Sequence, residues 1–381
     1  MSGIETAAAR LRDWAVRSAL PYWASRGFDA EGRRFHEGLT LDGKPLDAPI
    51  RLIVQARQVY SFTVAARYGW HPQARELAEA AYLAMCRDHY QAGGRDGWAY
   101  TVRRDGSVAD ARRDFYSHAF ALLAIASHVE ASGKRDALAL ADETLVFLDR
   151  DMKATSGGFI EGLPRLDVPR RQNPHMHLLE SLLALWQVSR ETKYLVRAGE
   201  VFDLFRDRFF QSPEGVLGEY YDERLSPAAG ETGKVVEPGH HYEWIWLLRW
   251  YETASGQDVQ FYVDALYDHA DRYGFSTRGL VVDELLSNGR VRKSSHRTWP
   301  MTEAIKANAV EAARGRPGAA GKCALLVARL FDHFLATETP GGWVDRLDGD
   351  ARPTADHIPA STLYHVMCAL HVLHTTAGRH A

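Results

Sequence analysis

The segment Gly157-Gly-Phe-Ile-Glu-Gly-Leu163 (GGFIEGL) is one copy of a motif that recurs along the whole chain. In each copy an apolar or aromatic residue is followed two positions later by an acid or a tyrosine, usually after glycine. The steps between successive copies are 63, 61, 58, 64 and 62 residues, which indicates a six-fold internal repeat. The copies are centred on Phe35, Trp98, Phe159, Leu217, Val281 and Trp343.

Apolar residues recur at helical spacing between these copies, as in HAFALLAIASHV (118–129) and HLLESLLALWQV (177–188). Prolines in step with the repeat mark the expected start of one helix in each unit, because proline is favoured in a first helical turn. Asn173 is expected to be the N-cap of the helix that follows it. The prolines are Pro49, Pro174, Pro238, Pro300 and Pro359, and the second unit has none.

Each unit is therefore predicted to contain a short hairpin or loop, a helix, a turn and a second helix, which fits a repeat of about 60 residues. Six such helix pairs that close on themselves form an all-α (α/α)6 barrel, in which the inner helices surround a pocket. Because closure needs every unit, residues 1–381 are expected to form a single catalytic domain. An open helical solenoid is the alternative.

The composition excludes several classes of partner. Lys and Arg number 46 against 49 Asp and Glu, a net charge of -3, so the chain has no basic field for nucleic acid or an anionic membrane. Cys86, Cys323 and Cys368 are far apart and lie in helical contexts, which indicates reduced thiols and a cytoplasmic protein without a zinc framework. A monomer or homodimer is expected, with no nucleic acid or membrane partner.

Chemically active side chains gather just after the predicted helix starts. His177 with Glu180, and His240 with Glu243, are three residues apart and therefore share a helix face. Trp299 lies beside the same rim, where an aromatic ring can stack on a ligand. The other units offer Arg57, His118, Glu303 and His365. We expect the histidines His177, His240 and His365 to be catalytic, and the substrate to be bound by Arg57, His118, Glu180, Glu243, Trp299 and Glu303.

Two kinds of chemistry suit this set of residues. Imidazole and carboxylate can bind zinc or iron, but His175 and His177 are two apart and His240 and His241 are adjacent, so each pair diverges on a helix. No metal or other cofactor is expected. Proton transfer fits better, because histidine is both acid and base near neutral pH and a neighbouring carboxylate fixes its tautomer. A pocket of this kind suits a monosaccharide whose carbon-bound proton must be moved.

Six segments, spread from about residue 35 to the C-terminus, resemble the N-acylglucosamine 2-epimerase family, which includes cellobiose 2-epimerases and mannose isomerases. The resemblance implies an (α/α)6 barrel and a sugar isomerase that needs no cofactor. The run from DGKPLDAP to VQARQVYSF is similar to the mannose isomerase branch, and YHVMCA replaces the YHVPR usual in acylglucosamine epimerases. The segments are RLIVQARQVYSF, NPHMHLLESLLALW, EPGHHYEWIWLL, RTWPMTEAIKA, GGWVDR and LYHVMCAL.

The resemblance also implies roles for individual residues. His240 and His365 match the central acid/base histidines of the family, and His177 matches a third active-site histidine. Glu243 and Glu303 match carboxylates that orient histidines or bind substrate hydroxyls.

Our hypothesis is reversible aldose–ketose isomerisation, D-mannose to D-fructose, through a cis-enediolate. His177 or His240 assists ring opening, and His365 moves the proton from C2 to C1. Arg57 and His240 act on the oxygens O1 and O2.

Several other activities stay open. Return of the proton to the opposite face of C2 would give a sugar 2-epimerase, of the mannose/glucose or N-acylglucosamine type. A phosphomannose isomerase-like activity is a further alternative, although no glycine-rich phosphate cradle is visible. An inverting glycoside hydrolase, which needs an acid and a base carboxylate, and a non-catalytic binding protein belong to other functional classes.

Overall fold

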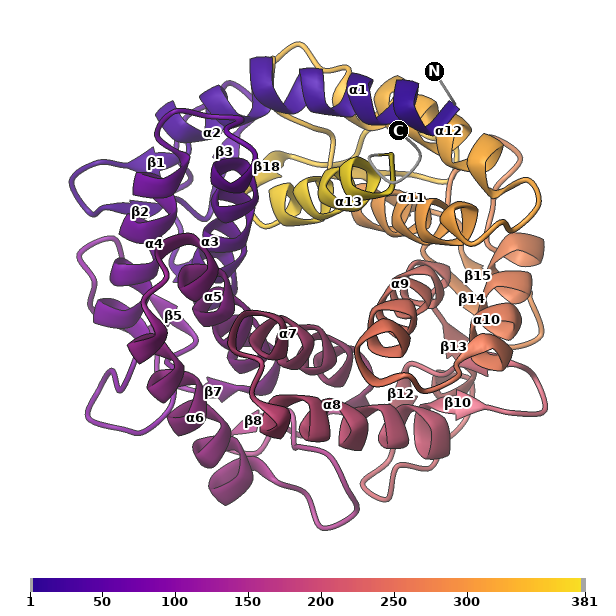
Figure 1. The fold of residues 1–381 in the computed structure, drawn as a ribbon, viewed down its shortest axis with the longest axis horizontal. Coiled ribbons are helices and arrows are strands. Elements are labelled where there is room, and N and C mark those ends of the chain that lie inside the picture. The colour runs from indigo at the N-terminus through magenta and orange to yellow at the C-terminus, as the bar shows by residue number, and fades with distance from the viewer. Residues whose placement is uncertain (1–2, 378–381) are drawn as a thin grey trace.

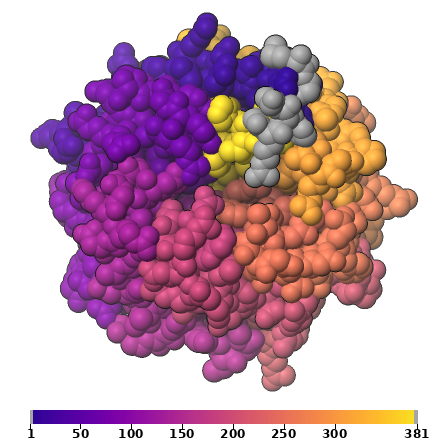
Figure 2. Space-filling view, in the orientation of Figure 1, coloured from indigo at the N-terminus to yellow at the C-terminus, as the bar shows by residue number. Residues whose placement is uncertain are grey.

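The computed structural model describes residues 3–377. Two concentric layers of helices form a ring, and the chain passes around it once, from indigo to yellow in Figures 1 and 2. Each inner helix packs against the next, and the last packs against the first. The inner helices of the described chain are α3 (Leu52–Arg67), α5 (Phe115–Ser132), α7 (Asn173–Ser189), α9 (Pro238–Ser255), α11 (Thr298–Ala313) and α13 (Thr362–Ala377).

The outer helices bury one face each, whereas the inner helices are buried nearly all round. In α8 the buried residues Tyr194, Ala198, Val201 and Phe202 form a stripe at helical spacing. Most outer helices end in a π-helical turn, at Ala15–Ala19, Leu148–Met152, Phe205–Phe209 and Phe331–Leu335. The outer layer consists of α1 (Gly3–Trp14), α2 (Leu20–Ser25), α4 (Ala74–His89), α6 (Leu138–Phe147), α8 (Thr192–Leu204), α10 (Gln260–Tyr273) and α12 (Ala319–Leu330).

Short antiparallel strands join the units to one another. β3 (Gly38–Thr40), from the first unit, pairs with β18 (His357–Pro359), from the last, and so links the two ends of the chain. The helix α1 packs on α12 and α13 across the same junction. The other pairs are β1 (Phe28–Asp29) with β2 (Arg34–Phe35), β7 (Arg113–Asp114) with β8 (Gly162–Leu163), β9 (Arg170–Arg171) with β12 (Tyr220–Tyr221), β10 (Phe210–Gln211) with β11 (Val216–Leu217), and β16 (His296–Arg297) with β17 (Arg346–Leu347).

Two sheets have three strands, and each contains a register shift. Their strands are β4 (Ile50–Arg51), β5 (Thr101–Val102) and β6 (Val108–Asp110) in one, and β13 (Val235–Val236), β14 (Glu284–Leu286) and β15 (Val291–Lys293) in the other. Within residues 3–377, no helix combines the length and apolar character that a membrane crossing requires.

The repeated motif has a structural purpose that the sequence did not reveal. The backbone N–H of its central residue donates to a side chain in the first turn of an inner helix: Phe159 to Nε2 of His175 at 3.0 Å, and Trp98 to Nε2 of His118 at 3.1 Å. Gly158, at φ 61°, precedes Phe159, and a Cβ there would lie 2.3 Å from the His175 ring. The glycine therefore permits the close approach. The equivalent backbone N–H donates in three other units: that of Phe35 to Oε1 of Gln55, that of Leu217 to Nε2 of His241, and that of Val281 to Sδ of Met301.

The proline pattern locates the inner helices with an error of a few residues. Pro174, Pro238 and Pro300 lie in the first turns of α7, α9 and α11, as expected, but Pro49 and Pro359 each precede their helix by three residues. Asn173 is already the first residue of α7 and makes no capping bond, so the N-cap expectation is wrong.

We expect the contact between Trp23 and Trp343 to contribute strongly to stability. The rings stack at 5.0 Å and are almost fully buried, and they join α2 to the last unit. Trp343→Ala is predicted to lower the free energy of unfolding by about 3–5 kcal/mol, measured by urea unfolding. Val146→Ala, at a site that is 60% exposed, is the control and should change it by less than about 0.5 kcal/mol. Equal effects of the two substitutions would contradict this role.

Candidate active site

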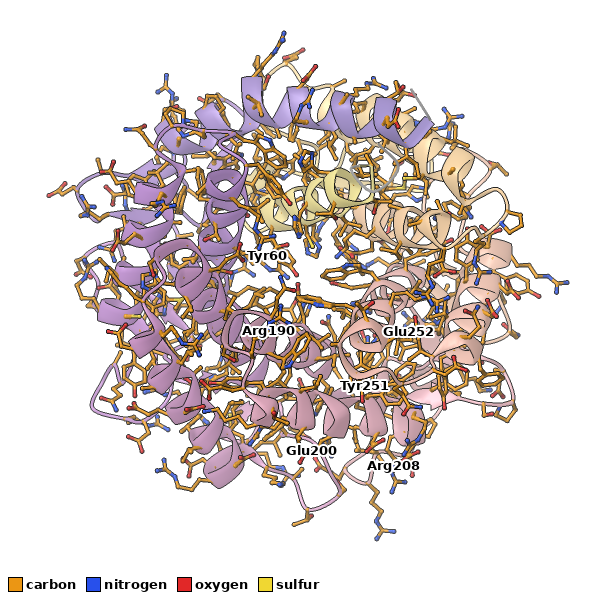
Figure 3. All side chains as sticks on the ribbon, in the orientation of Figure 1. Tyr60, Arg190, Glu200, Arg208, Tyr251 and Glu252 are labelled. Carbon is orange, nitrogen blue, oxygen red and sulfur yellow. The ribbon has the colours of Figure 1, made fainter. Side chains whose placement is uncertain are left out.

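A cavity lies where the N-terminal ends of the inner helices meet. Its volume is about 290 Å³, at the lower end of the range of small-molecule sites. Side chains of the inner helices project toward the middle of the ring (Figure 3). The cavity is lined by Arg57, Tyr116, Arg171, Asn173, His177, Glu219, Tyr220, Glu237, His240, Glu243, Arg297, Trp299 and His365. This list contains both proposed central histidines and four other residues that the sequence indicated.

Each cavity histidine is held by a carboxylate on its Nδ1. His177 Nδ1 lies 2.9 Å from Glu180, three residues further along the same helix, as the spacing predicted. His365 Nδ1 lies 2.9 Å from Glu303 of α11. Both carboxylates are buried behind the histidines and do not line the cavity, so they orient imidazoles. Orientation of a histidine agrees with the expectation for both acids, and substrate binding by Glu180 and Glu303 stays a prediction.

The carboxylate partner of His240 is Glu219, which the sequence analysis missed. Both oxygens of Glu219 lie 3.0 Å from Nδ1 of His240. The predicted partner, Glu243, instead places Oε1 at 3.9 Å from Nε2 of His177, and that oxygen accepts no hydrogen bond among the described residues. Glu243 is thus free to accept a bond from a ligand hydroxyl.

A change in the repeat explains why Glu219 binds a histidine. In the first, third and fifth units the acid of the motif pairs with an arginine just before the inner helix, as Glu161 does with Arg171 at 2.8 Å. In the fourth unit that position holds Glu237, so Glu219 has no guanidinium partner and accepts from His240 instead. The sequence shows the acid of the motif, but the side chain that this acid contacts is determined by the fold.

The two central histidines differ in charge. Burial opposes the charged form of His240, but the charges of Glu219 and Glu237 outweigh burial and raise its pKa to about 9. Burial lowers the pKa of His365 well below its usual value, and the Arg57 guanidinium adds to this effect. At neutral pH the cavity therefore holds a protonated His240 and a neutral His365, which are a matched acid and base.

Trp299 forms the wall between these two histidines. Its ring lies 4.9 Å from the ring of His240 and 5.8 Å from that of His365, measured between centroids. Both imidazoles therefore flank one flat apolar surface. A sugar ring or an extended polyol lying on it could reach both of them.

Arg57 brings a cation to the cavity without a carboxylate partner among the described residues. Its Nη2 donates to the Tyr116 hydroxyl at 2.9 Å, and its guanidinium lies 4.4 Å from the Phe120 ring centroid. By contrast, Arg297 donates to Asp283 at 2.7 Å and to Glu237 at 2.8 Å. Arg57 is thus the lining arginine whose charge remains for a developing oxyanion.

His118 does not reach the cavity. It is fully buried, its Nε2 accepts from the Trp98 amide, and its Nδ1 donates to the Asp114 carbonyl at 2.7 Å. Burial lowers its pKa to about 4. Substrate binding was expected of His118, but this residue lies outside the cavity lining and both of its ring nitrogens make hydrogen bonds within the repeat. His175 and His241 have the same structural role.

Asn173 is a second cavity residue that the sequence reasoning did not select for the site. It lines the cavity, and its Oδ1 is buried without a hydrogen-bond partner among the described residues. A ligand hydroxyl could satisfy this oxygen.

Two groups of side chains could in principle hold a cation: Glu219, Glu237 and His240, and Glu243, Glu303 and His365. In each group an acid already has a cationic partner. Glu237 accepts from Arg297, and Glu303 lies 2.5 Å from Nζ of Lys306. With these partners, both groups of side chains are arranged for hydrogen bonding and proton transfer.

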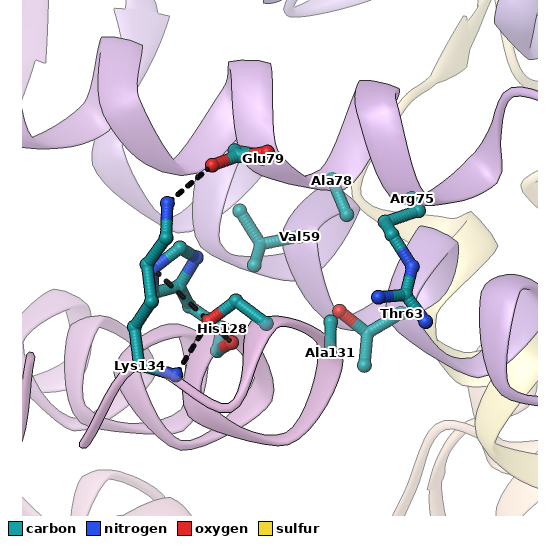
Figure 4. A pocket seen from close by; sticks show the side chains of 9 residues that line it. Val59, Thr63, Arg75, Ala78, Glu79, His128, Ala131 and Lys134 are labelled. Atoms are coloured by element: carbon teal, nitrogen blue, oxygen red, sulfur yellow. Dashed lines mark hydrogen bonds and ion pairs between the residues drawn. The ribbon is translucent and has the colours of Figure 1, made fainter.

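A separate hollow between α3, α4 and α5 lacks such a constellation (Figure 4). Lys134 and Glu79 form an ion pair of 2.8 Å beside it, and the ring of its histidine, His128, stacks on Tyr82 at 3.8 Å. We therefore assign the chemistry to the cavity of the ring.

Comparison with known proteins identifies related chains. The family model described as N-acylglucosamine 2-epimerase (GlcNAc 2-epimerase) matches residues 34–369. A mannose-6-phosphate isomerase from Rhizobium meliloti (strain 1021) is 36% identical, over 97% of each chain. A D-mannose isomerase from Thermobifida fusca is 28% identical, over 78% of this chain and 79% of that one.

Solved structures share the fold. The cellobiose 2-epimerase of Spirochaeta thermophila DSM 6192 superposes with a TM-score of 0.87 at 24% identity, and covers 99% of this chain and 98% of its own.

Glu219→Gln should lower the pKa of His240 markedly from about 9, because only the charges of Glu237 and Glu243 then oppose burial. NMR titration of the His240 ring protons measures this. Glu223→Gln, at an acid on the surface, is the matched control and should leave the titration unchanged. A midpoint that stays near 9 in Glu219→Gln would show that Glu219 does not hold the proton on His240.

Proposed function

The chain belongs to the N-acylglucosamine 2-epimerase family, and we propose that it is a cofactor-independent aldose–ketose isomerase that converts D-mannose to D-fructose. The observation that carries this proposal is the pair of cavity histidines, His240 and His365, which are each held on Nδ1 by a carboxylate and both lie against the Trp299 ring. The two similar proteins named as isomerases support an aldose–ketose reaction. We also propose that the ring is an (α/α)6 barrel that acts as a single catalytic domain, and the pairing of β3 with β18, which joins the first unit to the last, supports this.

His365 is the base of the proposed reaction. Its Nδ1 is engaged by Glu303, so the lone pair of Nε2 is available to take the proton from C2. The electrons left on C2 form the enediolate, and His240 gives its proton to O1 while Arg57 stabilises the negative oxygen. His365 then returns the proton to C1, and the proton of the O2 hydroxyl passes back to His240. The ketose forms without net gain or loss of protons.

Hydroxyl groups of the sugar would be held by polar atoms that have no partner among the described residues. Oε1 of Glu243 and Oδ1 of Asn173 are buried acceptors of this kind. Leaving such atoms unpaired costs free energy, so binding a polyol there is favourable. His177, which lies beside Glu243, is suited to assist ring opening.

A 2-epimerase is the second candidate. A protonated His240 across Trp299 could deliver its proton to the opposite face of C2, and several similar proteins are named cellobiose 2-epimerases. The two reactions share the first step and differ only in where the proton is returned.

The charges of the cavity favour a neutral sugar over a phosphorylated one. Arg171 and Arg297 are neutralised by Glu161 and by Asp283 with Glu237, which leaves only Arg57 among the lining arginines of the described chain. A phosphate group needs more than one free donor of positive charge. We expect kcat/KM for D-mannose to exceed that for mannose 6-phosphate by at least about tenfold. A preference for mannose 6-phosphate would instead assign the phosphomannose isomerase activity.

Loss of the base should abolish turnover. His365→Asn removes the group that moves the proton and should lower kcat by about 10²–10⁴. The thermal unfolding midpoint should change little, because the amide can still bond to Glu303. His118→Asn is a matched control at a structural histidine: it should lower the unfolding midpoint more than it lowers kcat. Near-normal turnover in His365→Asn would contradict the assignment.

The pH profile of kcat/KM should be bell-shaped with two separated limbs. The neutral form of His365 is active, so activity is lost as pH falls through its pKa, which lies below 6.5. The charged form of His240 is active, so activity is lost as pH rises through about 9. Initial rates between pH 4 and 10.5 test this. An alkaline limb near pH 7 would show that His240 is not the acid.

A further inference from the structure

Two histidine–carboxylate contacts with the same geometry hold opposite charges in this cavity. Glu219 lies 3.0 Å from Nδ1 of His240, and Glu303 lies 2.9 Å from Nδ1 of His365. A carboxylate at this distance normally favours the imidazolium form. The neutral state of His365 therefore needs a cause beyond its own hydrogen bond.

The two carboxylates differ in their second partner. Glu219 receives additional hydrogen bonds from neutral groups only, the amide of Gln172 at 3.0 Å and the backbone N–H of Glu237 at 3.4 Å. Glu303 has Nζ of Lys306 at 2.5 Å from its second oxygen. Burial and the charge of Glu243 raise the pKa of Glu303, and the Lys306 ammonium opposes this rise and favours the ionised carboxylate. One carboxylate thus presents its full charge to a histidine, and the other is already compensated.

Lys306 is fixed in place and remains charged. Its side chain is fully buried, and Nζ lies 3.9 Å from the Trp246 ring centroid and 3.5 Å from Sγ of Cys368. Burial opposes the charge, but the anionic groups around it, Glu303 among them, raise the pKa of Lys306 above its usual value. A buried lysine in such a setting acts as a permanent countercharge.

We propose that Lys306 is a positioning residue of the active site, which neutralises Glu303 and so keeps the Nε2 lone pair of His365 free to accept the substrate proton. This inference rests on the proposed function for its kinetic test. Lys306 does not touch the cavity and acts only through Glu303 and the field at His365.

Without Lys306, the Glu303–His365 pair would bind one proton at a higher pH. If that proton is on His365, the imidazolium has no lone pair. If it is on Glu303, the carboxyl O–H donates to Nδ1, and the ring hydrogen moves to Nε2. Either location disables the base, so the consequence does not depend on which group takes the proton.

The other groups around His365 stay in place when Lys306 is replaced, so they do not generate the predicted change. They come from four inner helices. These groups are Arg57 on α3, His177 and Glu180 on α7, His240 and Glu243 on α9, and Tyr364 and Cys368 on α13.

Lys306→Met tests the proposal, because methionine keeps the length and apolar stem of lysine. We expect the acid limb of kcat/KM to move up by at least about one pH unit, which is a tenfold loss at low pH, with recovery at higher pH. NMR titration of the His365 ring in the same variant should show the same displacement. A uniform loss at every pH, with an unchanged limb and titration, would mean that Lys306 is only structural and would overturn the proposal.

Lys322→Met is the matched control. Lys322 is a partly buried lysine of α12 that packs near the ring of Phe275, in the outer layer. Its replacement should leave both limbs of the profile in place. If the wild-type protein turns over no aldose, the proposed function fails, but the His365 titration still decides the role of Lys306.

A second pair of variants covers the case in which Lys306→Met does not fold. Glu303→Gln and the double variant Glu303→Gln/Lys306→Met differ only by the lysine charge, and the double variant has no uncompensated charge at these two positions. The acid limb and the His365 titration should lie at higher pH in the double variant. Coincident curves in this pair would overturn the proposal.

Discussion

The hydrogen bond between Nδ1 of a buried imidazole and a carboxylate is the interaction on which the site depends. It fixes the tautomer and directs Nε2 of His177, His240 and His365 away from its acid partner. Two of these bonds join different segments of the chain: Glu219 precedes α9, and Glu303 lies on α11 beside α13. The cavity also combines Arg57 of α3 with His365 of α13, two helices that pack together across the junction of the first and last units. Closure of the ring is therefore a condition for the complete site.

Hydrogen bonds of nearly equal length, 3.0 Å and 2.9 Å, hold imidazoles of unequal charge, and the second partner of each carboxylate contributes to this difference. Neutral donors leave the charge of Glu219 on His240, whereas Lys306 takes up the charge of Glu303. An acid and a base of the same residue type can thus stand on either side of Trp299 at one pH. Glu219 is available to His240 because the fourth unit has Glu237 at the position where the neighbouring units have an arginine.

The periodic motif predicted the helix pairs and most of the inner helix starts, because glycine, proline and apolar spacing are local properties. It also selected His177, His240, His365, Arg57 and Trp299, which line the cavity. The sequence could not assign Glu219 to His240, since 21 residues separate them and only folding brings them together. Nor could it separate His118 from the catalytic histidines. A histidine that accepts a motif amide and one that faces a cavity differ by a helical turn or less, and their side-chain directions depend on packing.

The central claim is that one base removes the proton from C2 and returns it to C1 of the same sugar. D-Mannose deuterated at C2, incubated with the protein in ordinary water, tests this most directly. The account predicts D-fructose that carries part of the deuterium at C1, and an aldose pool that remains mannose. Accumulation of D-glucose with a solvent hydrogen at C2 would contradict it, because that product requires protonation from the opposite face.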